Sequence, residues 1–171
     1  MIIAAHDTMN HLVAQYGSFA LFGLLAFGII GLPVPDETLL LVSGFMAAKG
    51  ELSLTAILIA AILGSCLGIT VSYLIGRFLG GKPILFFGKY IGITESKLKK
   101  AHDWFEKLGK YLLFVGYFIP GLRHFTGLCA GTTKLDYKTF AFFAYAGATV
   151  WAIIFTLTGY FFFNQWQHWH L

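Results

Sequence analysis

Apolar residues occur along this chain in uninterrupted blocks, which are separated by short polar or proline-containing breaks. Two of the blocks, Leu54–Gly76 and Thr139–Phe163, run for 23 and 25 residues without a charged side chain. An α-helix needs about 20 apolar residues to cross a bilayer, so both blocks are long enough. The pattern predicts two full transmembrane helices, over residues 54–80 and 137–163, and leaves residues 164–171 as a tail.

Four further apolar blocks are too short to cross a membrane alone, because each holds only 9 to 15 residues. They come in two pairs, and each pair flanks a break that contains proline. The blocks are residues 18–32, 38–48, 111–119 and 122–130, and the residues of the turns are Pro33, Pro35, Pro120 and Gly121. Two short arms joined at such a turn are typical of a re-entrant hairpin. We predict hairpins within 9–53 and 111–135; the alternative for the first is an ordinary span over Leu12–Leu32 followed by a surface loop.

The spacing of proline and glycine is the same in both halves of the chain. Eleven positions separate proline from glycine around each break, and twelve separate two glycines in each long block. The pairs are Pro33 and Gly44, Pro120 and Gly131, Gly64 and Gly76, and Gly147 and Gly159. One crossing and a surface connector separate the two hairpins, so the hairpins would approach the membrane from opposite faces. That arrangement is an inverted repeat, in which binding sites lie near the midplane.

The composition of the chain requires lipid as the solvent for much of its surface. Of the 171 residues, 57% are hydrophobic and only 12% are charged, about half the charged fraction of a soluble domain. We therefore predict an all-α integral membrane protein that consists of a single domain. The six histidines and two cysteines show no convincing metal-ligand spacing, so we expect neither a metal nor a cofactor.

Positive charge gathers in the connector, residues 81–110, and just before it. Eight of the twelve Lys and Arg residues lie between Arg77 and Lys110, against three acidic residues. The positive-inside bias places this connector in the cytoplasm. Residues Thr94–Lys110 carry apolar side chains at helical spacing among lysines, which predicts an amphipathic helix along the membrane interface. We do not expect nucleic-acid binding, because no soluble domain is present to display these lysines.

Small side chains recur every fourth residue along the first predicted span. This stripe includes Gly64, Gly68, Ser72 and Gly76. Small residues at this spacing allow the backbones of two helices to approach closely in a membrane. We therefore assign these four residues to helix packing.

Three charged residues fall at the breaks, where the hairpins would carry them into the membrane: Asp36, Glu37 and Arg123. A charge at the centre of a bilayer costs at least about 2.5 kcal/mol, so each of them needs a partner, water or a function. One interpretation is a structural ion pair between the two hairpin tips, and another is that the tips reach the solvated interface. The functional interpretation is that Arg123, at the start of a helix, binds a phosphate group, while Glu37 binds a proton reversibly.

Three segments resemble the signature blocks of the DedA family, the bacterial branch of the VTT-domain membrane proteins. They are GLPVPDETLLLVSGFMAAKG, GSCLGITVSYLIGRFLG and FIPGLRHFTGLCAG, and the resemblance covers residues 27–159. The resemblance implies opposed re-entrant hairpins in a multi-pass protein of the bacterial cytoplasmic membrane. It also implies translocation of a phosphorylated polyprenyl lipid, chiefly undecaprenyl phosphate, or of a phospholipid, and a dependence of some members on the proton motive force.

The resemblance can be carried over to single residues. Glu37 matches the acidic position after the Pro-x-Pro turn of the family, and Arg123 matches the arginine of its Pro-Gly-x-Arg motif. Gly76 and Arg77 match its Gly-Arg pair at the end of the first long span. The resemblance thus adds Arg77 to the expected phosphate site.

Taken together, residues and resemblance predict a site of five side chains. We expect Arg123, Arg77 and His124 to bind the phosphate of the lipid. Asp36 and Glu37 would carry proton coupling. No catalytic residue is predicted, because the expected activity is the movement of an intact lipid.

Two positions depart from the family pattern, and other functions stay open. Gly28 stands where an acidic residue is usual, and Tyr117 stands where a second arginine is usual, so proton coupling is left open. The alternative function is a proton-coupled transporter of a small solute or ion that uses Glu37. A lipid-phosphate phosphatase is a third, but His124 is its only candidate nucleophile. We do not expect an enzyme, and a homo-oligomer stays open.

Overall fold

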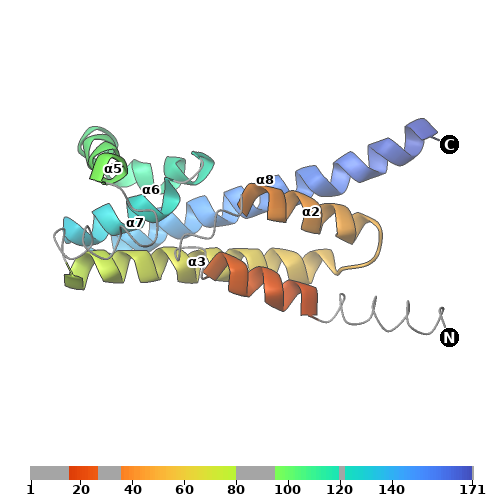
Figure 1. The fold of residues 1–171 in the computed structure, drawn as a ribbon, viewed down its shortest axis with the longest axis horizontal. Coiled ribbons are helices and arrows are strands. Elements are labelled where there is room, and N and C mark those ends of the chain that lie inside the picture. Colours follow the sequence, from red (N-terminus) through yellow and green to blue (C-terminus); the bar gives the residue numbers. More distant parts are fainter. Residues whose placement is uncertain (1–15, 27–35, 80–94, 120–121, 171) are drawn as a thin grey trace.

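The structure is a computed structural model, and it describes residues 16–26, 36–79, 95–119 and 122–170. Within these ranges the chain is helical and forms no strand. Two long helices, α3 (Leu54–Leu79) and α8 (Tyr137–His170), run along the molecule and pack against each other (Figure 1). Their segments Leu54–Phe78 and Tyr137–Phe162 are long and apolar enough to cross a membrane, so both segments predicted to span form helices of the required length and composition.

Polar residues determine where the two long helices begin. The hydroxyl of Ser53 accepts a hydrogen bond from the N–H of Ala56 at 3.4 Å, just before α3. The carboxylate of Asp136 accepts one from the N–H of Thr139 at 3.2 Å, just before α8. Both are N-caps, which satisfy N–H groups that have no partner inside the helix. At its other end α8 continues to His170, through the segment that we described as a tail.

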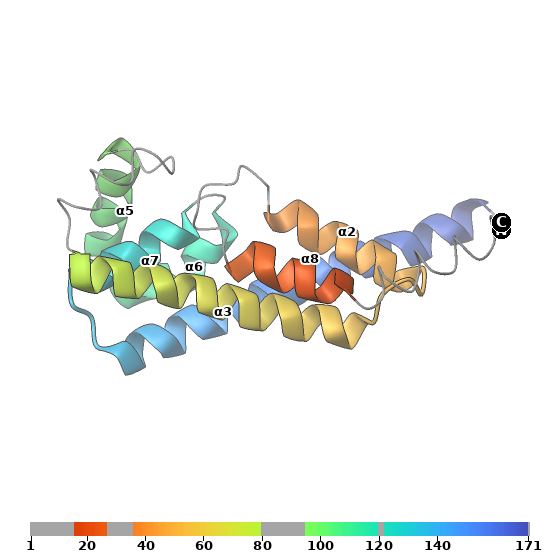
Figure 2. The same ribbon diagram turned by 60° about the horizontal axis from the view of Figure 1, so that its bottom comes forward.

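Short helices flank each of the two proline-containing breaks. Around the first break they are a helix at Tyr16–Ala26 and α2 (Asp36–Ala48). Around the second they are η3 (Gly109–Tyr111), α6 (Leu112–Val115), η4 (Gly116–Phe118) and α7 (Arg123–Thr132). Figures 1 and 2 show the first set over one half of the long helices and the second set over the other half.

Left-handed residues end the two short helices α2 and α7. Gly50 has a φ of 78° and Lys134 a φ of 55°. In each case the next residue donates its N–H to the carbonyl five positions back, at 3.0 Å. This is the Schellman arrangement, which satisfies carbonyls at a helix end and lets the chain turn. Each short helix thus turns towards the capped start of a long helix.

The short helices pack on the long helices in a crossed manner. Helix α2 packs chiefly against α8, and α7 packs chiefly against α3, so each lies on the long helix of the other half. Four glycines make these contacts close, because a Cβ on any of them would overlap a carbonyl oxygen of the facing helix. The glycines and the facing residues are Gly44 with Thr156, Gly159 with Leu41, Gly131 with Tyr73, and Gly76 with Leu128.

These contacts follow the spacing found in the sequence. Residues on α2 and α7 correspond with an offset of 87 (131 minus 44), and residues on α3 and α8 with an offset of 83 (159 minus 76). With these offsets the contact of Gly44 with Thr156 corresponds to that of Gly131 with Tyr73. The contact of Gly159 with Leu41 likewise corresponds to that of Gly76 with Leu128. Positions related by these offsets are equivalent in the two halves.

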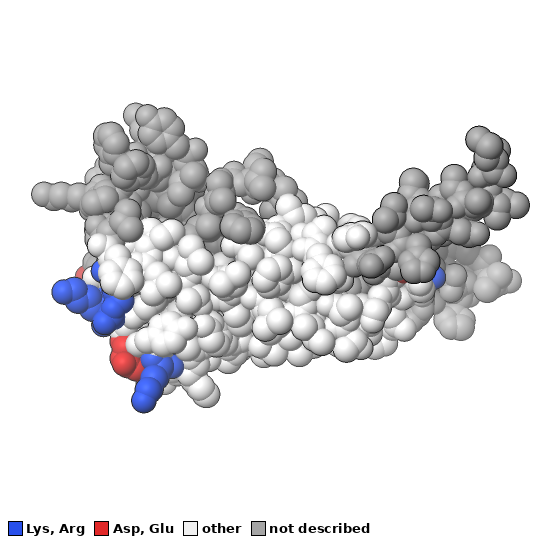
Figure 3. All heavy atoms as spheres, turned by 90° about the horizontal axis from the view of Figure 1, so that it is seen from below, with Lys and Arg blue, Asp and Glu red and all other residues white. Residues whose placement is uncertain are grey.

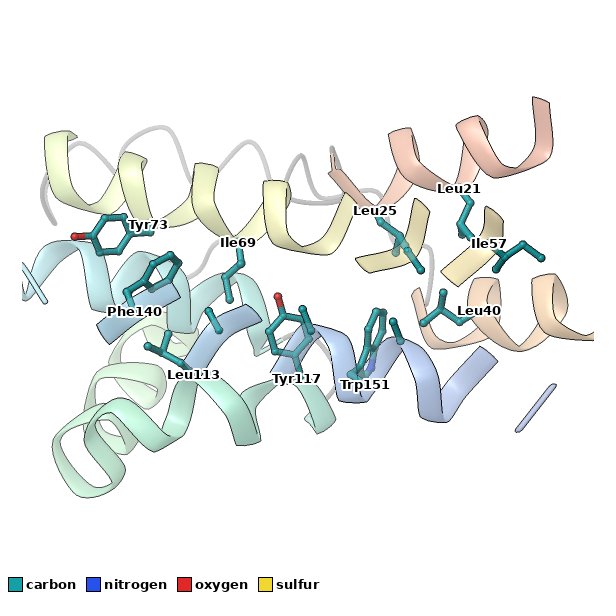
Figure 4. Close-up of a cluster of buried hydrophobic side chains, with 14 of the residues drawn as sticks. Leu21, Leu25, Leu40, Ile57, Ile69, Tyr73, Leu113, Tyr117, Phe140 and Trp151 are labelled. Atoms are coloured by element: carbon teal, nitrogen blue, oxygen red, sulfur yellow. The ribbon is translucent and has the colours of Figure 1, made fainter. Parts of the chain in front are cut away.

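A single large cluster of buried side chains lies between the long helices and the short ones (Figure 4). Its largest fully buried members are Trp151, Tyr73, Tyr117 and Phe140. Tyr73 stacks on Phe140 with ring centroids 4.3 Å apart, and Tyr117 lies 5.8 Å from Trp151. Aromatic contacts of this kind add stability beyond the burial of area. Aromatic packing therefore extends from the connector end to the middle of the bundle, and Leu21, Leu25, Leu40 and Ile57 fill the other half (Figure 4).

The outward side of the long helices is apolar. Large hydrophobic side chains are exposed along both, among them Ile59, Leu63, Leu67, Ile153, Ile154, Phe161 and Phe162. Figure 3 shows charged groups near the two ends of one face and an uncharged region between them. An apolar surface of this extent is unusual on a soluble monomer and suits contact with lipid.

The connector contains the predicted amphipathic helix. Helix α5 (Glu95–Leu108) lies within the predicted Thr94–Lys110, and Gly109, with a φ of 54°, follows its end. Phe105 packs on the buried cluster, while Trp104 is exposed. One face of this helix is therefore attached to the bundle and another is left to the surroundings.

Candidate functional site

Two of the charged residues predicted at the breaks begin helices in the middle of the bundle (Figure 1). Asp36 is the first residue of α2, and Arg123 is the first residue of α7. The positive end of the helix dipole stabilises a carboxylate there and destabilises a guanidinium. Arg123 is therefore stabilised by an acidic partner, or by an anionic ligand, at this point.

The two helix starts are joined by an ion pair. Nη2 of Arg123 lies 2.5 Å from Oδ2 of Asp36. The side chains are only 6% and 19% exposed, respectively. Removal of one partner from such a pair leaves a buried charge, at a cost of about 3–5 kcal/mol. The ion pair between the tips, one of the interpretations of the sequence, is thus present in the structure.

An aromatic residue of α8 supports the arginine. The guanidinium of Arg123 lies 4.9 Å from the ring centre of Trp151, which is fully buried. Tyr117 packs on Trp151 and donates a long hydrogen bond of 3.4 Å to the carbonyl of Ser65 on α3. A cation over an indole ring gains about 0.5–2 kcal/mol, more when water is excluded. The site therefore draws on α2, α7, α8 and η4.

Sequence reasoning did not single out Trp151, and it treated Tyr117 only as a departure from a family pattern. Within a long apolar run, the sequence does not distinguish an aromatic residue that faces lipid from one that is buried in the bundle. The signal that could have found Trp151 is its position relative to Gly68, 83 residues earlier, where the first half has no side chain. A large side chain at one of two equivalent positions indicates a difference in role.

Three buried polar side chains of the two long helices lack hydrogen bonds within the described part of the chain. The atoms are Ser65 Oγ, Trp151 Nε1 and Thr156 Oγ1. An unsatisfied buried group costs about 1–3 kcal/mol, and native interiors contain few. Ser65 lies on α3, Trp151 and Thr156 lie on α8, and Trp151 is the one that contacts Arg123. Water or a polar ligand at these atoms would provide hydrogen bonds that the described residues do not.

The remaining predicted site residues are not all gathered at this ion pair. Glu37 is half-buried and follows Asp36 in the first turn of α2. Arg77 lies near the end of α3, where its Nη1 donates hydrogen bonds to the hydroxyl of Tyr73 at 2.8 Å and the carbonyl of Leu135 at 3.3 Å. The structure does not bring Arg77 to Arg123.

The distance between the two arginines follows from the packing of α7. Gly131 lies against the backbone N of Arg77, eight residues beyond Arg123 on the same helix. Eight residues of α-helix span about 12 Å. Arg77 therefore lies apart from the ion pair, and a phosphate site shared by the two arginines remains only a prediction.

The small-residue stripe of α3 lies at two helix contacts. A Cβ on Gly64 or Gly68 would come within 2.8 Å of carbonyl oxygens of the helix Tyr16–Ala26. Ser72 is fully buried and faces Gly127 of α7, while Gly76 lies further along the same helix pair. The stripe thus contacts one short helix of each half.

Several predicted residues lie outside the described residues. They are Pro33, Pro35, Pro120 and Gly121, together with the side chain of His124. No group of three or more His, Cys, Asp or Glu side chains that could hold a metal ion occurs in the ranges that the structure describes.

Long apolar helices around a buried ion pair define a helical membrane protein. The chain matches the family model of the VTT domain over residues 34–161, and it belongs to this family, which includes the DedA proteins. It is 39% identical over 153 residues to an uncharacterized membrane protein, YbfM, of Bacillus subtilis, covering 90% of this chain and 94% of the relative.

Two further relatives carry more informative names. Undecaprenyl phosphate transporter A of Staphylococcus aureus is 31% identical, over 84% of this chain and 72% of the relative. Protein DedA of Escherichia coli is 34% identical, over 90% of this chain and 74% of the relative. The comparison with solved structures found no match.

Proposed function

We propose that this protein moves a lipid with a phosphate head group, of the polyprenyl phosphate class, across the bacterial cytoplasmic membrane. The observation that carries the proposal is the buried pair of Asp36 and Arg123 at the start of two short helices. A helix start and a guanidinium together form a binding site for a phosphate group. The name of the relative from Staphylococcus aureus supports the choice of lipid.

The proposed topology is an inverted repeat of two re-entrant hairpins, each followed by a membrane-spanning helix. The equivalent contacts of the four glycines support it, because they recur with the sequence repeat. The lysines of the connector support a cytoplasmic position for that end of the bundle. In this arrangement the ion pair lies near the midplane, as substrate sites do in transporters with such repeats.

Exchange of partners at Arg123 is the proposed central step. The phosphate of the lipid replaces the carboxylate of Asp36 on the guanidinium, which offers five N–H donors in a planar fork. Asp36 then loses its cation in a site of low dielectric, where a carboxyl group favours the protonated form. Uptake of a proton by Asp36 would accompany binding of the lipid, and its release would restore the ion pair. In this proposal Asp36, one of the two acids predicted to carry proton coupling, couples proton uptake to lipid binding.

Reorientation of a fluorescent short-chain polyprenyl phosphate in proteoliposomes tests this proposal. We expect the parent protein to move the intact lipid, and Arg123→Lys to retain part of the rate because the charge remains but the fork is lost. Release of inorganic phosphate in the same vesicles would instead support a phosphatase. If the parent protein neither reorients nor cleaves the lipid, the proposal is wrong and a small-solute transporter becomes the better candidate.

The topology has its own test. Single cysteines at Val34 and Leu122, introduced after replacement of Cys66 and Cys129, are labelled from the two sides of the membrane in turn. We expect the two positions to be labelled from opposite sides. Labelling of both from the same side would rule out opposed hairpins. The proposed position of the ion pair near the midplane would then also be wrong.

A further inference from the structure

A chain of hydroxyl groups joins the two long helices between the connector end of the bundle and its middle. The hydroxyls of Tyr137 and Tyr145, both on α8, lie 2.9 Å apart. The hydroxyl of Tyr145 lies 2.8 Å from that of Thr70 on α3. Thr70 in turn donates a hydrogen bond of 2.6 Å to the carbonyl of Cys66. We refer to Tyr137, Tyr145 and Thr70 as the hydroxyl track.

The track extends from the surface towards the ion pair. Tyr137 is the first residue of α8, and Tyr145 lies eight residues further on, about 12 Å along the helix axis. The hydroxyl of Thr149, one turn beyond Tyr145, bonds to the Tyr145 carbonyl. Trp151, which supports Arg123, follows two residues later but on the opposite side of α8, because residues two apart do not share a helix face. The track hydroxyls therefore cover part of the way from the start of α8 to the candidate site.

The track is open to its surroundings. Tyr137 is 45% exposed, and Tyr145 and Thr70 are half-buried. Arg77 lies at the same end of the bundle, held by Tyr73, and it is exposed. Exposed hydroxyls along a helix pair that otherwise faces lipid are costly unless they have polar company. Here the hydroxyls form hydrogen bonds with one another. Arg77 lies at the outer end, and an arginine side chain is well suited to bind phosphate.

The other half of the bundle has no such track. At the positions equivalent to Thr70 and Tyr145 it has Ile153 and Ile62. Its hydroxyls at Thr158 and Tyr160 make no hydrogen bond to another helix within the described part of the chain, and Thr158 bonds only to the carbonyl of Ile154. A packing requirement common to both halves therefore does not account for the track.

A proton relay does not account for the track either. Its inner end is a hydrogen bond from Thr70 to a backbone carbonyl, which has no proton to pass on. Hydroxyls and an arginine do offer what a moving phosphate group needs, which is a series of donors spaced a few ångströms apart.

We propose that the hydroxyl track, with Arg77 at its outer end, guides the phosphate head group between the connector side of the membrane and the Asp36–Arg123 site. The inference rests on the proposed function and adds a route to it. The hydrophobic tail of the lipid stays in the bilayer beside α3 and α8 while the head group exchanges donors along the seam. Because the opposite half has isoleucines at the equivalent positions, guided movement is confined to the connector side.

Cysteine labelling of full-length protein in liposomes tests the route, with an equivalent pair of positions as test and control. In a background of Cys66→Ala and Cys129→Ala, Thr70→Cys is compared with Ile153→Cys, using an anionic thiol reagent that enters water-accessible sites only. We expect Thr70→Cys to react, and short-chain polyprenyl phosphate to slow its labelling at least fivefold. We expect Ile153→Cys to react at a rate too low to measure. Equal labelling rates of the two cysteines, or no protection of Thr70→Cys by the lipid, would overturn the proposed route.

Removal of the hydroxyls gives a second, independent measurement. The variants Tyr145→Phe and Thr70→Val each lose about one hydrogen bond to the head group, so we expect each to slow lipid reorientation about fivefold. Tyr160→Phe and Thr158→Val, on the other half, should retain the parent rate. Equal rates of lipid reorientation in all four variants would contradict the route. If the parent protein still moves the lipid in that case, the proposed function stands. Protection of Thr70→Cys without any lipid movement by the parent would keep the track as a binding path and overturn the transport proposal.

Discussion

The two halves of the bundle make equivalent backbone contacts but differ in the side chains at their centre. Ser53 and Asp136 cap the two long helices at equivalent positions, and Gly44 and Gly131 make equivalent close contacts. The first residues of α2 and α7 are also equivalent, since 36 plus 87 is 123, yet they are Asp36 and Arg123. Two like charges would repel at this meeting point, whereas opposite charges form an ion pair.

A second difference lies directly beside the pair. The position on α3 equivalent to Trp151 is Gly68, where the backbone of the helix Tyr16–Ala26 comes close. The same position on α8 is filled by an indole ring under the guanidinium of Arg123. Backbone packing is thus duplicated, while the side chains at the centre differ between the two halves.

The largest effect is expected from Arg123→Ala, which removes the cation from the pair. Asp36 would then be buried without its partner, and we expect the folded state to lose about 3–5 kcal/mol. Lipid reorientation should fall below detection, because the phosphate loses its fork. Thermal unfolding in detergent and the liposome assay measure the two effects separately.

A charge exchange is the control for this variant. Asp36→Arg combined with Arg123→Asp keeps an ion pair between the two helix starts and should recover most of the lost stability. If the double variant is as unstable as Arg123→Ala alone, the pair does not hold the two halves together as described.

The next largest effect is expected at the glycine contacts. A Cβ at Gly44 or Gly131 would overlap a carbonyl of the facing long helix, so alanine at either position must separate two helices. Overpacking of this kind costs about 1–3 kcal/mol. We expect Gly44→Ala and Gly131→Ala to lower the thermal unfolding temperature by similar amounts, since the contacts are equivalent.

Gly23 provides the matched control for the glycine variants. It lies in the helix Tyr16–Ala26, and a Cβ there would meet no atom within 4 Å. Alanine favours helix by about 1 kcal/mol over glycine, so Gly23→Ala should be neutral or stabilising. A large loss at Gly23, or a loss at only one of the other two glycines, would break the proposed equivalence of the halves.

The sequence predicted the long elements well because their signal is simple. Run length alone identified α3 and α8, and the helical spacing of apolar residues among lysines identified α5. The breaks located the starts of α2 and α7, where proline and charge interrupt apolar segments. Run length, residue spacing and breaks are local features of the sequence. They can therefore be recognised without knowing which helices pack together.

The choice of the acid that pairs with Arg123 needed a feature that we did not use. Asp36, Leu40 and Gly44 follow one another at four-residue spacing, and Leu40 and Gly44 are buried against other helices. Residues four apart share a face of a helix. That face therefore places Asp36 inwards, whereas Glu37 belongs to the next face. The family resemblance directed attention to Glu37, whereas the four-residue spacing of Asp36, Leu40 and Gly44 indicates Asp36 as the acid that faces the other helices.

A smaller effect is expected from Trp151→Phe, which makes the two halves more alike at the centre. Phenylalanine keeps an aromatic face for Arg123 but has a weaker attraction for a cation and lacks the indole N–H. We expect a loss of about 1–2 kcal/mol in stability and a weaker affinity for the phosphate lipid, measured by thermal unfolding and by lipid binding to the solubilised protein. If affinity is unchanged while stability falls, Trp151 supports the bundle only and not the bound head group.

The smallest effects, and the sharpest comparison, concern Tyr73 and Thr156, which are equivalent positions on α3 and α8. The hydroxyl of Tyr73 donates to the carbonyl of Leu135 at 2.7 Å and accepts from Arg77, so Tyr73→Phe should cost about 0.5–1.5 kcal/mol. The hydroxyl of Thr156 is buried and has no partner within the described residues, so Thr156→Val removes an unsatisfied group and should be neutral or stabilising. Thermal unfolding of the two variants against the parent measures both. Destabilisation by Thr156→Val would mean that water or a ligand occupies this position in the folded protein, and the polar groups around Trp151 would then form a hydrated chamber beside the ion pair.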